Sequence, residues 1–200
     1  MTADLDLSNR INLRRASALV VDSNPQSLDL MRQILSGFSM RMIHTVETAQ
    51  EARRVFSCEG LELIVIDPLF VDDSGFDFIR WARRDEGSSN RCIAIIAALG
   101  HQTLGNVRAA PDAGANMVVA KPLSPEIILK RISWIARENR PFIVSPGYAG
   151  PDRGFKNEGP PRGMDGRRAD DLSAIVPTAK APNMSQSEVD NLFKPRKVAL

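Results

Sequence analysis

Three charged residues each directly follow a short apolar run: Asp22 after "ALVV", Asp67 after "LIVI" and Lys121 after "MVVA". Runs of this kind predict buried strands of a parallel sheet, and functional groups gather beyond the carboxyl ends of such strands. Because these ends meet at one edge of the sheet, we expect the two carboxylates and the ammonium group close together. The sequence therefore predicts an acidic pocket faced by a lysine.

Apolar segments alternate with segments of helical periodicity from about residue 16 to residue 139. This alternation predicts an α/β domain, with a parallel five-stranded sheet covered by helices on both faces. Ser124 and Pro125 are typical of a helix start. The expected strands cover 16–21, 40–45, 61–66, 92–97 and 116–120, and the expected helices cover 25–38, 48–57, 75–84, 103–114 and 124–139.

The segments "VVDSN", "LIVIDP" and "VVAKP" together resemble the receiver domain of CheY-like response regulators, over about residues 14–138. The resemblance implies a flavodoxin-like (βα)5 fold with strand order 2-1-3-4-5. It also implies that Asp67 is the phosphoacceptor, that Asp22 binds Mg²⁺ and that Lys121 pairs with the phosphoryl group. Carboxylate oxygens suit Mg²⁺, and a cation can offset phosphoryl charge. A histidine kinase or phosphotransferase would then be a partner.

The sequence departs from the receiver pattern at three positions around this pocket. Ser23 stands where a second acidic residue is usual, which predicts weakened Mg²⁺ binding. Ala97 is assigned to the hydroxyl position at the end of the fourth strand, and Val118 to the switching aromatic of the fifth. Two interpretations stay open: a receiver that is phosphorylated on Asp67, or a receiver fold kept as a scaffold.

The periodicity stops near residue 139, and residues 140–182 contain six glycines and seven prolines. This composition is typical of an extended, flexible linker. The stretch also contains residue types that suit a guanine nucleotide. Arginine can bind guanine O6 and N7, a carboxylate can accept from the amino edge of the base, and aromatic rings stack on it. The candidate ligand-binding residues are Tyr148, Asp152, Arg153, Phe155, Arg162, Asp165, Arg167 and Arg168.

A receiver followed by "YAGPDRG…PRGMDGRR" resembles the Cle group of CheY-like proteins. This resemblance implies that the arginine-rich tail binds cyclic di-GMP and that the protein acts at the flagellar motor, on motility or surface attachment. Gly154 departs from a form of the motif that has a second arginine after "GPDR". Two alternatives stay open: a solvated linker without a ligand, and a nucleic-acid-binding tail. The interspersed acidic residues argue against nucleic-acid binding. The affinity of such binding would fall steeply with salt.

The segment "MSQSEVDNLF" (184–193) predicts a short helix. Ser185 and Glu188 form a capping box, and Val189, Leu192 and Phe193 share one face. The segment resembles the N-terminal peptide of the flagellar switch protein FliM, which docks on CheY. The resemblance implies docking on this receiver or on a sister receiver, whereas a capped helix without a special partner is the alternative.

The remaining features bound the organisation and the function class. The net charge of +2 argues against a bulk nucleic-acid or membrane binder, and the two cysteines form no C-x-x-C motif. No apolar run could cross a bilayer, the acidic start predicts no signal peptide, and no catalytic set is visible. We expect a cytoplasmic protein that is not an enzyme and that is recruited to the flagellar pole. The expected organisation is a flexible N-terminus (1–13), receiver (14–139), ligand-binding tail (140–182), helical motif (183–194) and flexible end (195–200).

Overall fold

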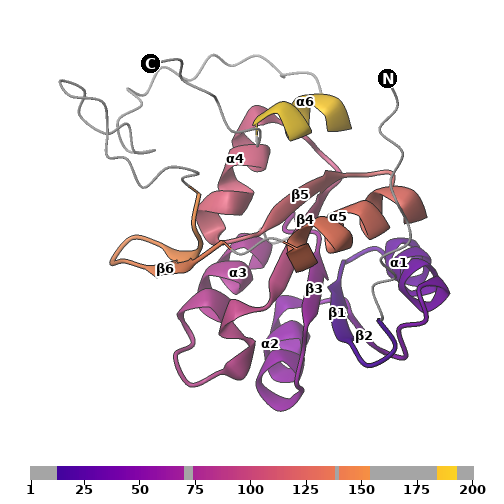
Figure 1. The fold of residues 1–200 in the computed structure, drawn as a ribbon, viewed down its shortest axis with the longest axis horizontal. Coiled ribbons are helices and arrows are strands. Elements are labelled where there is room, and N and C mark those ends of the chain that lie inside the picture. Colours follow the sequence, from indigo (N-terminus) through magenta and orange to yellow (C-terminus); the bar gives the residue numbers. More distant parts are fainter. Residues whose placement is uncertain (1–12, 70–73, 138–139, 154–183, 193–200) are drawn as a thin grey trace.

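A computed structural model of the chain describes residues 13–69, 74–137, 140–153 and 184–192. Its main sheet is parallel and has the order β2-β1-β3-β4-β5, which confirms the predicted flavodoxin-like fold (Figure 1). The strands are β1 (Ser17–Val21), β2 (Met42–Val46), β3 (Leu63–Ile66), β4 (Ala94–Leu99) and β5 (Met117–Ala120). The helices are α1 (Pro25–Gly37), α2 (Ala49–Cys58), α3 (Ser74–Arg84), α4 (Leu104–Ala113) and α5 (Pro125–Arg137), with a 3₁₀ helix η1 (Ser89–Cys92).

Two apolar layers enclose the sheet, because its central strands carry apolar side chains on both faces. Helices α1 and α5 cover one face, where Met31 and Ile128 are buried. Helices α2, α3 and α4 cover the other face, where Phe56 and Phe78 meet edge to face. This three-layer arrangement leaves the carboxyl ends of the strands free to position a site.

The register of the sheet brings the strand ends level. Val21 pairs with Ile66 across β1 and β3, and Leu99 pairs with Ala120 across β4 and β5. The residues that follow these strands therefore meet at one edge of the sheet. The carboxyl ends of three different strands can thus contribute side chains to a single pocket.

Strand β4 begins two residues later than the sequence predicted, because η1 occupies the residues before it. Asn90 in η1 is buried, and its side-chain amide donates to the carbonyls of Phe56 and Glu59 at 2.7 Å. Its Oδ1 accepts from the N–H of Leu61 at 3.0 Å. These bonds tie the segment to the end of α2, so the extended strand starts only at Ala94.

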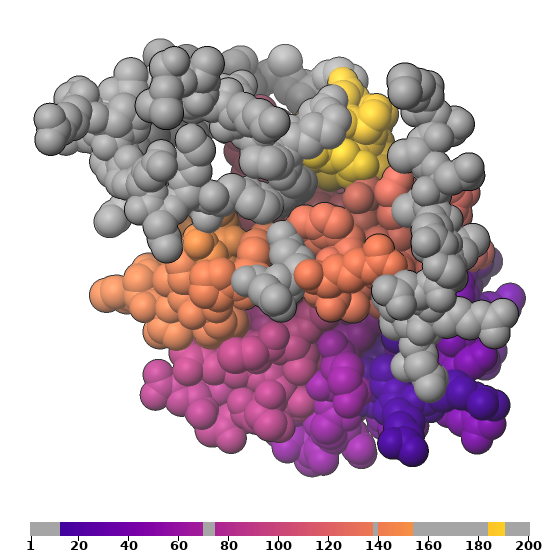
Figure 2. All heavy atoms as spheres, in the orientation of Figure 1, coloured from indigo at the N-terminus to yellow at the C-terminus, as the bar shows by residue number. Residues whose placement is uncertain are grey.

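Two further elements pack on the receiver after α5. A two-stranded antiparallel hairpin consists of β6 (Phe142–Val144) and β7 (Ala149–Pro151), and a helix, α6, spans Gln186–Leu192. Figure 2 shows both on the surface of the molecule, the hairpin in orange and α6 in yellow. The hairpin was not expected, because its short strands contain the proline and glycine that the sequence analysis assigned to a linker. Within the described residues, no helix is long and apolar enough to cross a membrane.

Candidate functional site

The acidic pocket predicted from the sequence lies at the carboxyl end of the sheet. Asp22 follows β1 and Asp67 follows β3, two buried strands that pair directly. The N–H of Asp67 donates to the carbonyl of Val21 at 2.9 Å, so the main-chain ladder holds the two acids side by side. Asp22 is only 6% exposed. A cation is therefore needed beside these carboxylates.

Lys121, directly after β5, supplies that cation. Its Nζ lies 2.6 Å from Asp22 Oδ2 and 2.6 Å from Asp67 Oδ2. Burial disfavours the charged ammonium, but the hydrogen bonds to both carboxylates outweigh this cost and raise the pKa of Lys121 above its ordinary value. All three residues predicted for the pocket thus come together, and the lysine offsets the repulsion between the acids.

The other carboxylate oxygens accept main-chain hydrogen bonds. Asp22 Oδ1 accepts from the N–H of Asn24, and Asp67 Oδ1 accepts from that of Leu69, each at 2.9 Å. Ser23 is exposed. The described part of the chain holds no group of three His, Cys, Asp or Glu side chains that could bind a metal ion. The two carboxylates are bound to the ammonium group of Lys121, so the described residues do not form a ready Mg²⁺ site. Mg²⁺ binding stays a prediction.

The strand-end position beside Asp67 differs from the one that the sequence analysis assigned. Because β4 continues to Leu99, Ala97 lies inside the strand opposite Ile66 and is fully buried. Gly100 borders the pocket instead, since a Cβ atom there would lie 4.0 Å from Asp67 Oδ2. Ala97 was therefore wrongly assigned to the end of the fourth strand, because the observed strand lies two residues later than the predicted one. Neither Leu99 nor Gly100 carries a hydroxyl group.

Val118, the residue at the position of the switching aromatic, is enclosed in the core. It is 1% exposed and belongs to the apolar cluster under α2, α3 and α4. A side chain packed at this density cannot move between core and surface without unpacking its neighbours. The pocket therefore lacks the hydroxyl and the aromatic group that the receiver resemblance implied for a response to phosphorylation.

Arg83 on α3 joins the receiver to the hairpin. Its side chain is 1% exposed, and its guanidinium lies 5.7 Å from the ring centroid of Phe142 in β6. Burial lowers its pKa to about 10, so it is still charged at neutral pH. Its hydrogen bonds, all 2.7–2.9 Å, go to the carbonyl oxygens of Arg91, Ile93 and Gly114 and to Asn116 Oδ1.

Two glycines allow the hairpin to approach the end of α4 closely. Gly114 has φ of +110°, and a Cβ atom there would lie 2.7 Å from the carbonyl oxygen of Ala149. A Cβ atom at Gly150 would lie 2.9 Å from the Cα of Gly114. Main chain therefore packs against main chain at this contact, which only residues without side chains permit.

The hairpin places the first predicted ligand-binding residues on the receiver. The guanidinium of Arg153 lies 4.2 Å from the ring centroid of Tyr148, whose hydroxyl donates to the carbonyl of Pro151 at 2.7 Å. Burial raises the pKa of Tyr148, although the neighbouring arginines oppose this shift. Arg153 also pairs with Asp112 on α4. The N–H of Asp152 donates to the carbonyl of Pro141 at 2.8 Å, and the other predicted residues, Phe155, Arg162, Asp165, Arg167 and Arg168, lie outside the described residues.

Helix α6 is seated on the edge strand β5 and on α5. Val189 is fully buried, in the apolar cluster that also holds Val118. Gln186 Oε1 accepts from the N–H of Ala120 at 2.7 Å, which satisfies a donor of the sheet edge. Asp190 forms an ion pair with Arg131, whose side chain is only 13% exposed. The predicted helical segment therefore docks on its own receiver.

The capping box predicted for this helix is present. The N–H of Ser185 donates to Glu188 Oε2 at 2.7 Å, and the N–H of Glu188 donates back to Ser185 Oγ at 3.4 Å. The bonds that the N–H and the hydroxyl of Ser185 donate to its carboxylate lower the pKa of Glu188. The side chain of Leu192 and all of Phe193 lie outside the described residues, so the apolar face is represented by Val189.

Sequence reasoning missed the residues that hold the two tail elements. Arg83 is four positions after the buried Ile79, so helical spacing alone could have placed it on the buried face of α3. Gln102, which is 4% exposed, lies in a loop and gives no such signal. Its partners are distant in sequence, and only the folded chain identifies them.

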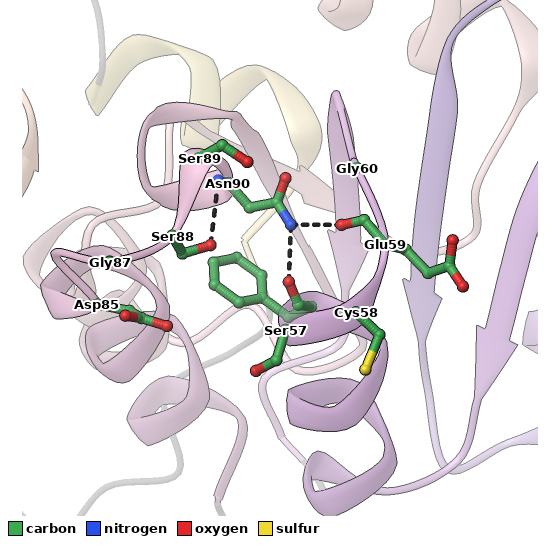
Figure 3. A pocket seen from close by; sticks show the side chains of 10 residues that line it. Ser57, Cys58, Glu59, Gly60, Asp85, Gly87, Ser88, Ser89 and Asn90 are labelled. Carbon is green, nitrogen blue, oxygen red and sulfur yellow. Dashed lines mark hydrogen bonds between the residues drawn. The ribbon is translucent and has the colours of Figure 1, made fainter.

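An open cavity of about 460 Å³ lies away from this edge, between the end of α2 and η1. Figure 3 shows Asn90 in this region, with its amide turned toward the carbonyls that end α2. Because those bonds satisfy its side chain, Asn90 holds η1 against α2. The cavity contributes nothing to the site at the strand ends.

Comparison with known proteins identifies the domain. Residues 18–133 match the family model described as the response regulator receiver domain. Transcriptional regulatory protein GltR of Pseudomonas aeruginosa is 28% identical over 123 residues, which are 60% of this chain and 49% of GltR, so the chain spans about half the length of that curated relative.

Solved structures show the same fold. A CheY-like receiver domain protein from Methanospirillum hungatei has a TM-score of 0.54 at 24% identity, over 60% of this chain and 92% of that one. Chemotaxis response regulator CheY4 of Vibrio cholerae has a TM-score of 0.54 at 20% identity, over 60% and 98%. The family model covers more than half of the sequence and the observed sheet order agrees with it. The chain therefore belongs to the response regulator receiver family.

Proposed function

We propose that this receiver is an effector that binds cyclic di-GMP through its arginine-rich tail and then acts on the flagellar motor. The observation that carries the proposal is the stack of Arg153 on Tyr148, presented on a hairpin that is fixed to the receiver. A guanine base is planar and stacks on aromatic rings and guanidinium groups. The start of the tail thus offers a surface suited to such a base.

The charge around this stack favours an anionic ligand. Arg84 donates to the carbonyl of Pro146 on the hairpin at 3.3 Å, and Arg140 lies 5.0 Å from the ring centroid of Trp134. Guanidinium groups bind phosphate oxygens with charge-assisted hydrogen bonds. A cyclic dinucleotide would need both features: stacking surfaces for its bases and guanidinium groups for its phosphates.

The composition of the acidic pocket supports an input other than phosphorylation. Lys121 satisfies both acids, and the strand ends lack the hydroxyl and the aromatic groups of the usual pattern. A signal that enters through the tail would bypass these positions. Ordering of the tail around a ligand is a recognised type of switch.

Calorimetric titration of cyclic di-GMP into the full chain tests the proposal. We expect saturable binding that Arg153→Ala weakens about tenfold or more, because charge-assisted hydrogen bonds contribute about 1.5–3 kcal/mol. Arg32→Ala is the matched control, since Arg32 is an exposed arginine on α1 paired with Asp29. The absence of saturable heat with the full chain would overturn the nucleotide proposal.

The proposed binding partner of this receiver is a flagellar switch or motor protein. Binding would control motility or surface attachment. The segment of α6 resembles the FliM peptide that docks on CheY, and its docking here, with Val189 buried on the receiver and Glu188 exposed, supports a place for this receiver at the flagellar switch. Binding of the full chain to a purified flagellar switch protein should tighten when cyclic di-GMP is added. An affinity that does not respond to the nucleotide would contradict this step.

A phosphorylated response regulator is the second candidate. It is favoured by the geometry of Asp67, whose Oδ2 lies 2.6 Å from Lys121 Nζ. A histidine kinase or phosphotransferase would then be the phosphodonor. This candidate predicts Mg²⁺-dependent labelling of the full chain by a small phosphodonor, with no labelling of Asp67→Asn.

A further inference from the structure

The surface of β5 and α5 on which α6 lies, called its seat here, includes Ala120 and Arg131. This seat and the acidic pocket use neighbouring residues at the end of β5. The N–H of Ala120 donates to Gln186 of α6, and the next residue, Lys121, binds the pocket acids. The N–H of Lys121 donates to the carbonyl of Leu99 at 2.9 Å. A displacement of Lys121 therefore acts on the same short piece of main chain that holds α6.

Gln102 makes a second connection between the two places. Its carbonyl accepts from the N–H of Met184, directly before the capping box of α6, at 2.9 Å. Its side-chain Nε2 donates to the carbonyl of Leu99 at 2.5 Å and to that of Lys121 at 3.4 Å. Since Gln102 is 4% exposed, losing either partner would leave a buried polar group unsatisfied, which costs about 1–3 kcal/mol.

We expect helix α6 to be either docked or unfolded, because it is too short to be stable alone. It spans only seven residues, and isolated helices shorter than about 12 residues are marginal in water. Leaving the seat therefore means unfolding, with exposure of Val189 and loss of the bond to Ala120. A small change at the seat can be converted into an all-or-none change of this segment.

We propose that α6 and the acidic pocket form one coupled unit in which Gln102 is the positioning residue. Moving Lys121 off its carboxylates loosens α6, and unseating α6 frees Lys121. The inference goes beyond the proposed function, since it holds whether or not the tail binds a nucleotide. It also gives this receiver a route from pocket to surface that needs neither a hydroxyl nor an aromatic switch residue.

Hydrogen exchange of the amides of residues 186–190 in the full chain tests the forward direction. Lys121→Met should accelerate their exchange about fivefold or more, the lower end of typical coupling between two sites. Lys130→Met, which removes an exposed lysine from α5, is the matched control and should have no effect. Unchanged exchange in Lys121→Met would overturn the proposal.

A double variant tests the role of Gln102. Gln102→Ala should accelerate exchange in α6 by itself, and Lys121→Met should add little in that background, because residues of one network are not additive. Independent, multiplicative effects of the two changes would contradict Gln102 as the connection. Thermal unfolding of each variant shows whether the receiver itself is still folded.

Chemical labelling of Lys121 tests the reverse direction, as reciprocity requires. Val189→Asp should unseat α6 and raise the rate at which an amine-reactive reagent modifies Lys121 severalfold, by mass spectrometry. Val144→Asp is the matched control, because Val144 is 55% exposed on the hairpin. If α6 unfolds in Val189→Asp while the labelling rate stays constant, the two places are independent and the proposal fails. Neither readout involves cyclic di-GMP, so these outcomes are separate from those of the nucleotide titration.

Discussion

The hairpin β6–β7 and the helix α6 both follow α5 in the chain and pack on the receiver, but different interactions hold them. The hairpin is joined by the contact of the buried Arg83 with the ring of Phe142 and by contact of main chain with main chain at Gly114 and Gly150. Among the described side chains, helix α6 is held by the buried Val189, by hydrogen bonds and by an ion pair with Arg131. The hairpin is therefore an extension of the fold, whereas α6 is the part that can leave.

This difference agrees with the two proposed roles, ligand binding by the hairpin and signal output by α6. A ligand-binding stack needs a rigid support, and the hairpin provides it for Tyr148 and Arg153. A segment that reports a signal must be drawn from the less stable parts of a protein. The small seat of α6 meets that requirement.

The largest effect is expected from Arg83→Ala, which should destabilise the receiver and remove the contact with Phe142 of the hairpin. The change removes a buried donor from three main-chain carbonyls, and it leaves Asn116 Oδ1 with only the N–H of Ile95. We expect a loss of at least about 3 kcal/mol in the free energy of unfolding, measured with urea. Arg80→Ala on the exposed face of the same helix is the control and should change stability by less than about 0.5 kcal/mol.

Gly150→Ala should break the contact between the hairpin and α4 and leave α6 in place. The added methyl group would meet the Cα of Gly114 at 2.9 Å and the hydroxyl of Tyr148 at 2.6 Å. Overpacking of this kind costs about 1–3 kcal/mol. Faster hydrogen exchange should be confined to the hairpin. Gly147→Ala, where the new group meets nothing within 4 Å, should leave exchange there unchanged.

Val189→Ala should have the opposite distribution, loosening α6 and sparing the hairpin. Removing two buried methyl groups costs about 1.5 kcal/mol, which corresponds to about a tenfold rise in the unseated population. Limited proteolysis at α6 would measure this rise. Equal protection of α6 in Val189→Ala and in the exposed-site control Val144→Ala would show that apolar burial does not hold the helix.

A smaller effect is expected from Asp190→Asn, which removes the ion pair with Arg131. One partner is largely buried and the other is 35% exposed, so we expect a cost of about 0.5–1 kcal/mol at the seat of α6. Added salt should reduce the difference between the variant and the parent protein. Asp29→Asn, which breaks an exposed pair on α1, should leave proteolysis of α6 unaffected.

Alkaline pH should weaken the pocket through Lys121. The pKa of this lysine is raised in the fold, so its contribution to stability is complete below its unfolded value of 10.5 and is lost as pH rises through the higher folded value. Urea unfolding at a series of pH values above 10.5 should show the loss in the parent protein. Lys121→Met should lack this component of the alkaline decline.

Much of the receiver could be predicted from the sequence, because β1, β3 and β5 contain continuous apolar runs that are each followed by a charged residue. The position beside Asp67 could not, since strand β4 is displaced by the bonds of Asn90 to α2, and that displacement moves Ala97 into the core. The hairpin was also missed, because its strands of three residues have no periodicity to detect.

The amino-acid sequence by itself determined the parallel sheet and the convergence of Asp22, Asp67 and Lys121. The physical reason is that the ends of parallel strands share one edge, so residues directly after them must meet. Only the tertiary structure decided where the tail elements lie and that Gln102 bonds to both the pocket strands and the start of α6. Those contacts join residues far apart in the chain, and they depend on register and on close packing, which local patterns do not encode.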